Sequence, residues 1–264
     1  MNSLITITLL ASALFLNSPK KKIKSITETQ SDALNRITGI LKKEFDETGF
    51  LVKQTSLTRD KKIEAYTIYI ANEKGLVSGE GSYNAGGILT DTAFYLYNDK
   101  GDLVRQTRSF PQRGETYVEQ FNIEYDAKGN VVKETQLDKD SVLDWEYFYQ
   151  NNKAGQKIRL LTKFPGEIRN AYEYSYKDTF MTKMILFDYD NEKKQKKVNT
   201  TDIFIYDKQG RLIQKNVSSF HYGLGRMEKS EYVYKYDEHG MLLSLDNKVE
   251  GTLKTIRQYT YEYF

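Results

Sequence analysis

Carboxylates, two histidines and many tyrosines are the side chains with which this 264-residue chain could do chemistry. A glycosidase needs two carboxylates that face each other across the scissile bond, and the 36 acidic residues are too many for counting alone to exclude such a pair. Several of them, however, occupy a recurrent turn pattern in which an acid is needed for structure. We expect this structural role for Asp46, Asp126, Asp207 and Asp237.

Nucleophilic and metal chemistry find little support in the sequence. The Gly-x-Ser-x-Gly, His-Glu-x-x-His and phosphate-loop patterns do not occur. His221 and His239 lie far apart, and with no cysteine the chain has too few nitrogen and sulfur ligands for a zinc site. The acidic cluster at 188–192 offers oxygen ligands for calcium but lacks the glycine and the distal glutamate of an EF-hand loop. We therefore expect no catalytic residue, no metal and no cofactor.

Aromatic side chains are the remaining candidates for binding. The chain has 21 Tyr, 13 Phe and one Trp, and exposed Tyr and Trp rings offer an apolar plane with a polar edge to a sugar or a protein partner. We expect Arg105, Lys133 and Gln214 to supply hydrogen-bond donors beside these rings. In the alternative interpretation, the rings are the core of a coiled sheet, with Lys and Arg stems packed over them. The candidate binding residues are Trp145, Tyr147, Tyr174 and Tyr234.

These aromatic residues belong to a phrase of about 27 residues that recurs roughly eight times. In the copy at 125–132, a Tyr ends an alternating segment, an Asp and two polar residues follow, and a Gly precedes two valines. The Asp can accept from the backbone two residues on and the Gly supplies a positive φ, as in a type I turn closed by a left-handed residue. Each copy therefore predicts a β-hairpin. The clearest turn residues are Asp126, Gly129, Asp207, Gly210, Asp237 and Gly240.

The turn predicts which side chains lie opposite each other. If Asn98 pairs with Asp102, then Tyr97 lies opposite Leu103 on the same face, and an aromatic–aliphatic pair closes the hairpin. Alternation along the incoming strand places every second residue on that face, for example Trp145, Tyr147 and Tyr149. Weaker copies of the pattern occur at 71–75 and 149–155 and at Tyr176.

About 16 such strands in succession predict an all-β protein, an antiparallel meander of about eight β-hairpin repeats. Sheets of more than about ten strands must curl, split or close. We therefore expect a strongly coiled sheet or an incomplete barrel with the tyrosines inside. Residues 31–44 are ambiguous, because Leu34, Ile37 and Leu41 also fit helical spacing. The expected organisation is an N-terminal lead-in at 19–39 and a single repeat domain at 40–264.

Residues 1–18 carry no charged side chain and contain an apolar stretch from Leu4 to Leu16. That stretch is too short to span a bilayer and is typical of a secretory signal peptide. We predict that residues 1–18 are a signal peptide, so that the mature chain is exported to the periplasm, the cell surface or the medium without a membrane span. The 39 basic and 36 acidic residues are interspersed, which argues against the clustered basic face of a nucleic-acid-binding protein.

The repeats resemble the YD repeats of RHS and teneurin-type proteins, whose units carry a Tyr-Asp-x-x-Gly-x-Leu core. The match is nearly complete at 125–131, 206–212 and 236–242, and it covers residues 40–264 in degraded form. The resemblance implies a β-hairpin spiral on exported and surface proteins, which in large members wraps around a toxin cargo. This chain is too short to enclose a cargo and shows no core-associated protease motif, so the shell function is not carried over.

The functional expectation is a non-enzymatic, exported or cell-surface β-repeat scaffold that binds a glycan or a protein partner through its aromatic face. Catalysis needs a unique constellation of residues, whereas repetition spreads similar residues over a surface. Two alternatives stay open. The first is a carbohydrate-active enzyme with a carboxylate pair across a pocket, and the second is an immunity or chaperone partner of a larger toxin.

Overall fold

A computed structural model describes residues 22–264, which form strands and tight turns and contain no helix in this range. The predicted signal peptide lies outside the described residues. Within them there are 18 β-strands rather than about 16, and no helix of the described part is long and apolar enough to cross a membrane. The all-β class and the antiparallel meander of hairpins are confirmed.

The described chain falls into two compact units. Unit 1 holds residues 22–66, 204–216 and 229–264, and unit 2 holds residues 67–203 and 217–228. Strands β4 (Ile63–Ala71), β14 (Gln195–Tyr206), β15 (Leu212–His221) and β16 (Arg226–Tyr236) contribute residues to both units. The prediction of a single repeat domain at 40–264 stays a prediction.

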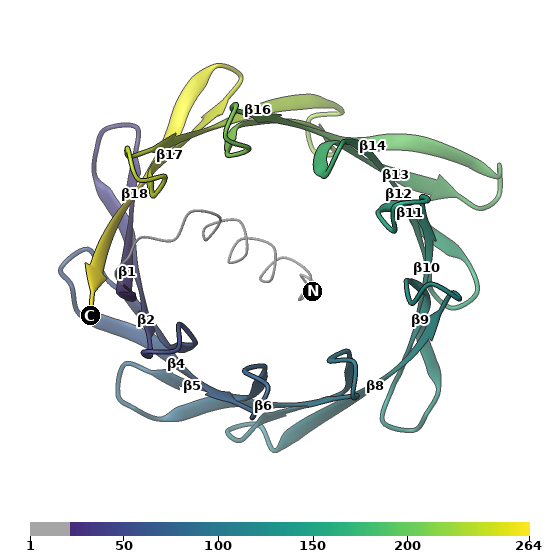
Figure 1. Ribbon diagram of the computed structural model, residues 1–264, viewed down its shortest axis with the longest axis horizontal. Helices are drawn as coiled ribbons and strands as arrows, with labels where there is room; N and C mark the ends of the chain where they lie inside the picture. Colours follow the sequence, from purple (N-terminus) through teal and green to yellow (C-terminus); the bar gives the residue numbers. More distant parts are fainter. Residues whose placement is uncertain (1–21) are drawn as a thin grey trace. The chain divides into compact units, whose positions relative to one another are not determined.

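Unit 1 contains the first and the last strand of the described chain, and they pair with each other. Its antiparallel order runs β3–β2–β1–β18–β17–β16, and Figure 1 shows β1 and β18 side by side. Strand β1 therefore pairs with a strand on each side, as β18 does, and neither of the two strands is a free edge. The bounds are β1 (Ile23–Asp32), β2 (Ile37–Phe45), β3 (Leu51–Leu57), β17 (Leu242–Val249) and β18 (Thr252–Tyr263).

Residues 31–44, for which the sequence left a helix open, complete β1, turn, and begin β2. The turn uses the same chemistry as the repeats, because Asp32 Oδ1 accepts from the amides of Leu34 and Arg36 at 2.9 and 3.0 Å. Asn35 takes the place of the glycine with a φ of 60°, a conformation that asparagine tolerates better than most residues. The helical interpretation is wrong, and the stretch expected as a lead-in already contains a paired strand.

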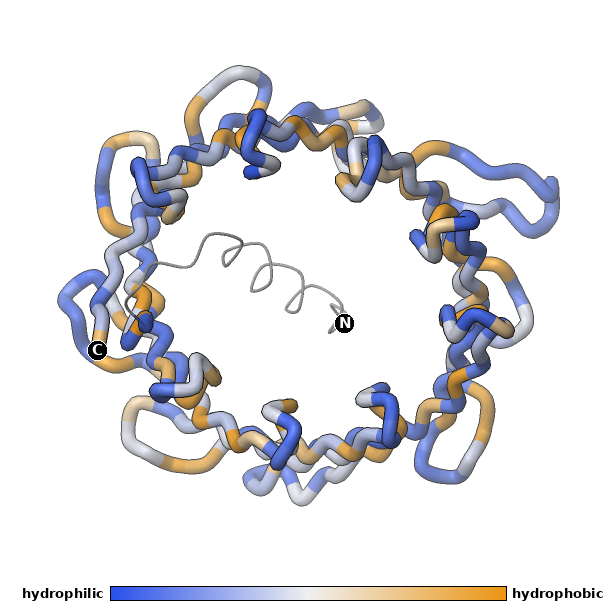
Figure 2. The backbone as a smooth tube through the Cα atoms, viewed as in Figure 1, coloured by the Kyte–Doolittle hydropathy of each residue, from blue (hydrophilic) through white to orange (hydrophobic). Residues whose placement is uncertain are grey.

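Unit 2 is a meander in which each strand from β5 to β14 pairs with the next. The bounds are β5 (Val77–Asn84), β6 (Leu89–Tyr97), β7 (Leu103–Phe110), β8 (Glu115–Tyr125), β9 (Val131–Leu137), β10 (Leu143–Asn151), β11 (Lys157–Lys163), β12 (Ile168–Lys177) and β13 (Phe180–Asp190). Along the strands, hydrophobic and hydrophilic residues interchange over short distances, as Figure 2 shows. This is the pattern expected of strands whose two faces meet different surroundings.

The predicted turn chemistry is confirmed. Gly49, Gly101, Gly129, Gly210 and Gly240 have φ values of 78° to 89°. In the Asp126 turn, Oδ1 accepts from the amides of Lys128 and Asn130, both at 2.9 Å. The register also matches, since Tyr97 lies opposite Leu103, Tyr125 opposite Val131 and Tyr236 opposite Leu242.

A second bond of the repeat was not predicted, and it joins one hairpin to the preceding one. The hydroxyl of Tyr97 donates to the carbonyl of Val77 at 2.7 Å, and that of Tyr236 donates to the carbonyl of Leu212 at 2.8 Å. The acceptor is in each case the first residue of an earlier strand. Tyr176 and Tyr261 make the same contact, to Lys157 and Leu242. The tyrosine of the repeat is thus a link between neighbouring hairpins, which a phenylalanine could not make.

Candidate binding face

The tyrosine face of unit 2 combines aromatic rings from the strands that enter the turns with polar groups from the strands that leave them. The register sets Gln106 opposite Tyr95, Gln136 opposite Trp145 and Glu134 opposite Tyr147. We call this surface the tyrosine face. Its aromatic residues and its polar residues are Tyr95, Trp145, Tyr147, Tyr149, Tyr172, Tyr174, Glu80, Gln106, Glu119, Glu134 and Gln136. It offers flat apolar surface beside hydrogen-bonding groups.

The opposite face of unit 2 holds the residues that alternate with these, and it carries two of the three donors that the sequence assigned to the rings. Arg105 pairs with Leu96 and Lys133 with Phe148, so neither points toward the tyrosine rings. The reason is a bulge just after the turns that precede these two residues, seen as register shifts between Leu96 and Tyr97 and between Glu124 and Tyr125. The bulge moves the outgoing strand by one residue and exchanges its faces. The assignment of Arg105 and Lys133 as donors to the aromatic face is wrong. Gln214, the third assigned donor, bonds to Asn216 and Glu231 in unit 1.

Trp145 is the centre of an aromatic cluster on the tyrosine face. Its ring centroid lies 4.9 Å from that of Phe164 and 6.4 Å from that of Tyr147. The Tyr147 hydroxyl donates to Oε1 of Gln136 at 3.4 Å, and Nε2 of Gln136 donates to Asp144 at 3.5 Å. Trp145 and Tyr147 remain half-buried. The cluster therefore packs internally and still presents ring surface together with amide and carboxyl groups.

The two other candidate residues lie apart from this cluster. Tyr174 stacks on Tyr172 in unit 2, with centroids 6.4 Å apart and an interplanar angle of 10°. Tyr234 belongs to unit 1, where it pairs with Leu245. The structure thus brings Trp145 and Tyr147 together and places Tyr174 on another strand of the same unit.

Ionisable groups on the tyrosine face are shifted by their surroundings. Burial raises the pKa of Tyr147 to about 12, with the negative charge of Glu134 adding to the effect, and burial likewise raises the pKa of Tyr95 and Tyr174. The pKa values of Glu119 and Glu134 are also raised by burial. These side chains are half-buried, and partial exclusion of water strengthens a hydrogen bond made beside them.

A hollow of about 320 Å³ opens on the tyrosine face at the turn end of β9, β10 and β11. The Tyr149 hydroxyl donates to Oε2 of Glu134 at 3.3 Å, and Nζ of Lys157 lies 4.1 Å from the centroid of the Tyr149 ring. Burial lowers the pKa of Lys157, while the charge of Glu134 acts in the opposite direction. The hollow is lined by Asn130, Val131, Glu134, Tyr149, Asn151, Gly155 and Lys157.

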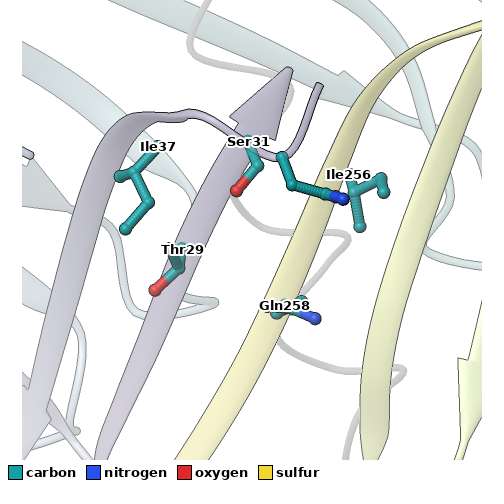
Figure 3. A pocket seen from close by; sticks show the side chains of 6 residues that line it. Thr29, Ser31, Ile37, Ile256 and Gln258 are labelled. Carbon is teal, nitrogen blue, oxygen red and sulfur yellow. The ribbon is translucent and has the colours of Figure 1, made fainter. Parts of the chain in front are cut away.

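A second hollow, of about 450 Å³, lies in unit 1 across β2, β1 and β18. Figure 3 shows Thr29 and Ser31 on β1, with Ile37 on one side and Ile256 and Gln258 on the other. Its lining residues, which include Asn35, are all uncharged. Gln258 and Tyr259 are consecutive residues of β18 and point to opposite faces of the sheet. This hollow therefore opens on the face away from the tyrosines of β18. Neither of the two hollows is lined by two carboxylates.

The acidic cluster considered for calcium is occupied by contacts within the protein. Asp188 accepts from Asn199 at 2.8 Å and from the Tyr222 hydroxyl. Asp190 accepts from the amide of Lys193 at 3.0 Å, and this bond lowers its pKa most strongly. No group of three or more His, Asp or Glu residues in the part of the chain that the structure describes is arranged to hold a metal ion.

The hollow at Glu134 was missed by sequence reasoning, although a signal for it exists. In the register, the position of Tyr97 is taken by Asn151 and that of Leu103 by Lys157. The closing aromatic–aliphatic pair is therefore replaced by two polar residues in this repeat. The copy at 71–77 also lacks the ring, but it has two apolar residues, Ala71 and Val77, at these positions. A comparison of the copies would therefore have picked out the one at 151–157 by its two polar residues.

The architecture defines the protein as a β-hairpin repeat protein, and solved structures match it at low identity and with TM-scores below 0.5. No family model matches the chain, and no curated protein does. A Tc holotoxin pore structure from Photorhabdus luminescens matches with 14% identity and a TM-score of 0.39 over 83% of this chain, which spans 11% of that toxin chain. Porin-like proteins from Bacteroides uniformis and Bacteroides vulgatus match over 92% of this chain and 99% of theirs. Their identities are 12% and 9%, and their TM-scores are 0.46 and 0.35.

Proposed function

We propose that this protein is an exported, non-catalytic β-hairpin scaffold of the YD-repeat type that binds a glycan through the tyrosine face of unit 2. The observation that carries the proposal is the Trp145 cluster, in which half-buried rings lie beside the amide of Gln136 and the carboxyl of Asp144. Sugars present C–H faces that pack on aromatic rings and hydroxyls that bond to amides and carboxyls. Both kinds of group occur here on one face.

A non-catalytic role is supported by the lining of the two hollows. A glycosidase carries two carboxyl groups about 5–10 Å apart across its cleft, whereas the hollow in unit 2 has Glu134 as its one carboxyl and the hollow in unit 1 has none. The acids at the turns are engaged with the backbone, as Asp126 is. This arrangement favours binding over hydrolysis.

Export is proposed from the uncharged apolar stretch at 4–16, which precedes lysines at positions 20, 21, 22 and 24. Mass spectrometry of the protein from a bacterial host with an intact secretion system tests this directly. We expect a mature chain that starts near residue 19. An intact Met1 in the cytosolic fraction would contradict export.

Glycan binding is tested on an array of neutral and acidic oligosaccharides with the wild-type protein and Trp145→Phe. The phenylalanine keeps a ring in the cluster but removes the larger indole surface. We expect the wild type to bind a defined group of glycans and Trp145→Phe to bind the same group more weakly. Equal binding by both proteins, or release of reducing ends from a bound glycan, would contradict the proposal.

A further inference from the structure

The repeat at 149–157 differs from its neighbours at the two positions that close the hairpin. In the copies at 45–51, 97–103, 125–131 and 236–242, the closing pair consists of an aromatic and an aliphatic side chain. In this copy the pair is Asn151 and Lys157. A ring and a branched apolar chain are thus absent from one place on the tyrosine face, and the hollow of about 320 Å³ lies there.

Some of the polar groups that line this hollow retain hydrogen-bonding capacity beyond their bonds within the protein. Nδ2 of Asn151 donates to the carbonyl of Val131 at 3.0 Å, in the place of the usual tyrosine hydroxyl. Nδ2 of Asn130 is held by Asp126 at 2.8 Å. Glu134 accepts from Tyr149 and retains the accepting capacity of its other oxygen. Lys157 has three N–H donors, and no acidic oxygen within 4.0 Å pairs with its Nζ in the described part of the chain.

Lys157 and Glu134 face the same space without forming an ion pair. Both contact Tyr149, because Glu134 accepts from its hydroxyl at 3.3 Å and the Lys157 ammonium rests on its ring at 4.1 Å. A group that both accepts a hydrogen bond from an ammonium and donates one to a carboxylate can bridge them. A hydroxyl does this, whereas a carboxylate or an ammonium of a ligand would repel one of the two.

We propose that the hollow formed by Glu134, Tyr149, Asn151 and Lys157 is a subsite for one neutral sugar residue, whose hydroxyls bridge the Lys157 ammonium and the Glu134 carboxylate. The inference rests on the proposed glycan-binding function and names the place and the class of sugar. Trp145 lies four residues before Tyr149 on the same face of β10, about 13 Å away at the usual rise of a strand. A single oligosaccharide can therefore contact the Trp145 cluster and this subsite together. The volume lies at the lower end of the range of known small-molecule sites.

The repeat itself supplies the sharpest variant. The double change Asn151→Tyr with Lys157→Leu restores the closing pair of the other copies and fills the hollow, so we expect the melting temperature to stay the same or rise. A milder variant, Lys157→Met, removes the ammonium and keeps the length of the side chain. Lys133→Met is the matched control, because Lys133 lies on the opposite face of the adjacent strand, 5.4 Å from the ring of Phe148.

Binding is measured by isothermal titration calorimetry with neutral hexasaccharides of β-1,4-linked glucose, xylose and mannose, and with the hexamer of galacturonate as the acidic probe. We expect at least one neutral hexasaccharide to bind better than galacturonate. We expect Lys157→Met and the double variant to bind it at least tenfold more weakly, and Lys133→Met to bind like the wild type.

The outcomes separate the two proposals. If Trp145→Phe weakens binding while the double variant binds like the wild type, the glycan-binding face stands and the subsite is overturned. If galacturonate binds best, the assignment to a neutral sugar is overturned. If the wild type binds none of the hexasaccharides and no glycan of the array, the proposed function itself fails. A double variant that melts well below the wild type would show that Asn151 and Lys157 are needed for the fold, and this would overturn the subsite as an unfilled position of the repeat.

Discussion

Both faces of unit 2 carry large apolar side chains, but these side chains differ in how exposed they are. On the opposite face, Phe94 and Leu96 are 58% and 59% exposed. On the tyrosine face of the same strand, Ala93 is 0% exposed, and Tyr95 and Tyr97 are half-buried. The difference follows from hydrogen bonding, because a hydroxyl lets the ring of Tyr97 reach the carbonyl of Val77 in the preceding hairpin. Phe94 and Leu96 have no such anchor.

Hydrophobicity alone therefore does not choose the buried face in this repeat. Many of the large residues that the described chain leaves exposed are isoleucine, leucine or phenylalanine, whereas Tyr95 and Tyr174 on the tyrosine face are half-buried. Tyrosine combines ring area with a donor that satisfies a backbone carbonyl, and an unsatisfied buried carbonyl is costly.

Trp145→Ala is expected to show the largest effect of this comparison. The Trp145 ring packs on Phe164 and Tyr147, so its truncation should lower the free energy of unfolding by about 2–4 kcal/mol. Phe94→Ala on the opposite face should cost less than about 1 kcal/mol, because Phe94 is 58% exposed. Urea melts of the two variants measure the difference, and equal losses would mean that the faces are energetically alike.

Gly129→Val should cost about 1–2 kcal/mol, because it forces a β-branched side chain to a φ of 84°. An added Cβ meets nothing within 4 Å, so the cost is one of backbone strain. Gly240→Val should cost as much, because β17 after this turn pairs with β18, and β18 is held by β1. Gly39→Val is the control, since Gly39 lies in a strand with open space and without a positive φ. Its stability should change by less than about 0.5 kcal/mol. A melting curve of Gly129→Val that matches the wild type would refute the turn assignment.

Tyr97→Phe tests the link between hairpins by removing one hydroxyl. The carbonyl of Val77 loses its 2.7 Å bond, and we expect a loss of about 1 kcal/mol in thermal or urea unfolding. Tyr117→Phe removes a hydroxyl from a residue that is 54% exposed and should cost less than about 0.5 kcal/mol. If both variants unfold alike, the hydroxyl of Tyr97 does not stabilise the repeat.

The smallest effect expected is a pH dependence of opposite sign at Glu134 and Asp126. Burial raises the pKa of Glu134 above 4.5, so its stability contribution is present below pH 4.5 and lost as the pH rises through the raised pKa. Bonds from the Asn130 side chain and backbone lower the pKa of Asp126 below 3.8. Its contribution is therefore present above pH 3.8 and lost as the pH falls further.

Urea melts between about pH 3 and pH 7 measure both effects. Glu134→Gln should flatten the loss of stability above pH 4.5, and Asp126→Asn should flatten the loss below pH 3.8. Wild-type-like pH profiles in both variants would contradict the assigned surroundings of these two carboxyls.

The sequence predicted the local hairpins well, because the Asp-x-x-Gly turn determines which residues on its two sides lie opposite each other. The pairs of Tyr97 with Leu103 and of Tyr125 with Val131 follow from turn geometry alone. The turns at Asn35, Lys61 and Ser141 were less visible, since these residues adopt φ values near 60° without being glycine. The pairing of β1 with β18 is a contact across the whole described chain, which no local pattern encodes.

The candidate site was predicted only in part. The aromatic positions of Trp145 and Tyr147 were found from alternation, and the structure brings them together. Their polar neighbours were misassigned to Arg105 and Lys133, because the bulge after the turns that precede these residues leaves no clear mark in the sequence and exchanges the faces of the outgoing strand. To predict the hollow at Lys157 from the sequence, one would have had to know of the bulge and to compare the closing pairs of all copies.

The fluorescence of Trp145 tests the central claim most directly, because it is the only tryptophan of the chain and lies on the tyrosine face. The wild-type protein is titrated with the neutral hexasaccharide that binds most tightly, and the emission spectrum is recorded at each step. The account predicts a saturable change in intensity or emission maximum, with the same dissociation constant as calorimetry gives. Binding that leaves the spectrum unchanged would place the glycan elsewhere and contradict the assignment of the tyrosine face as the binding surface.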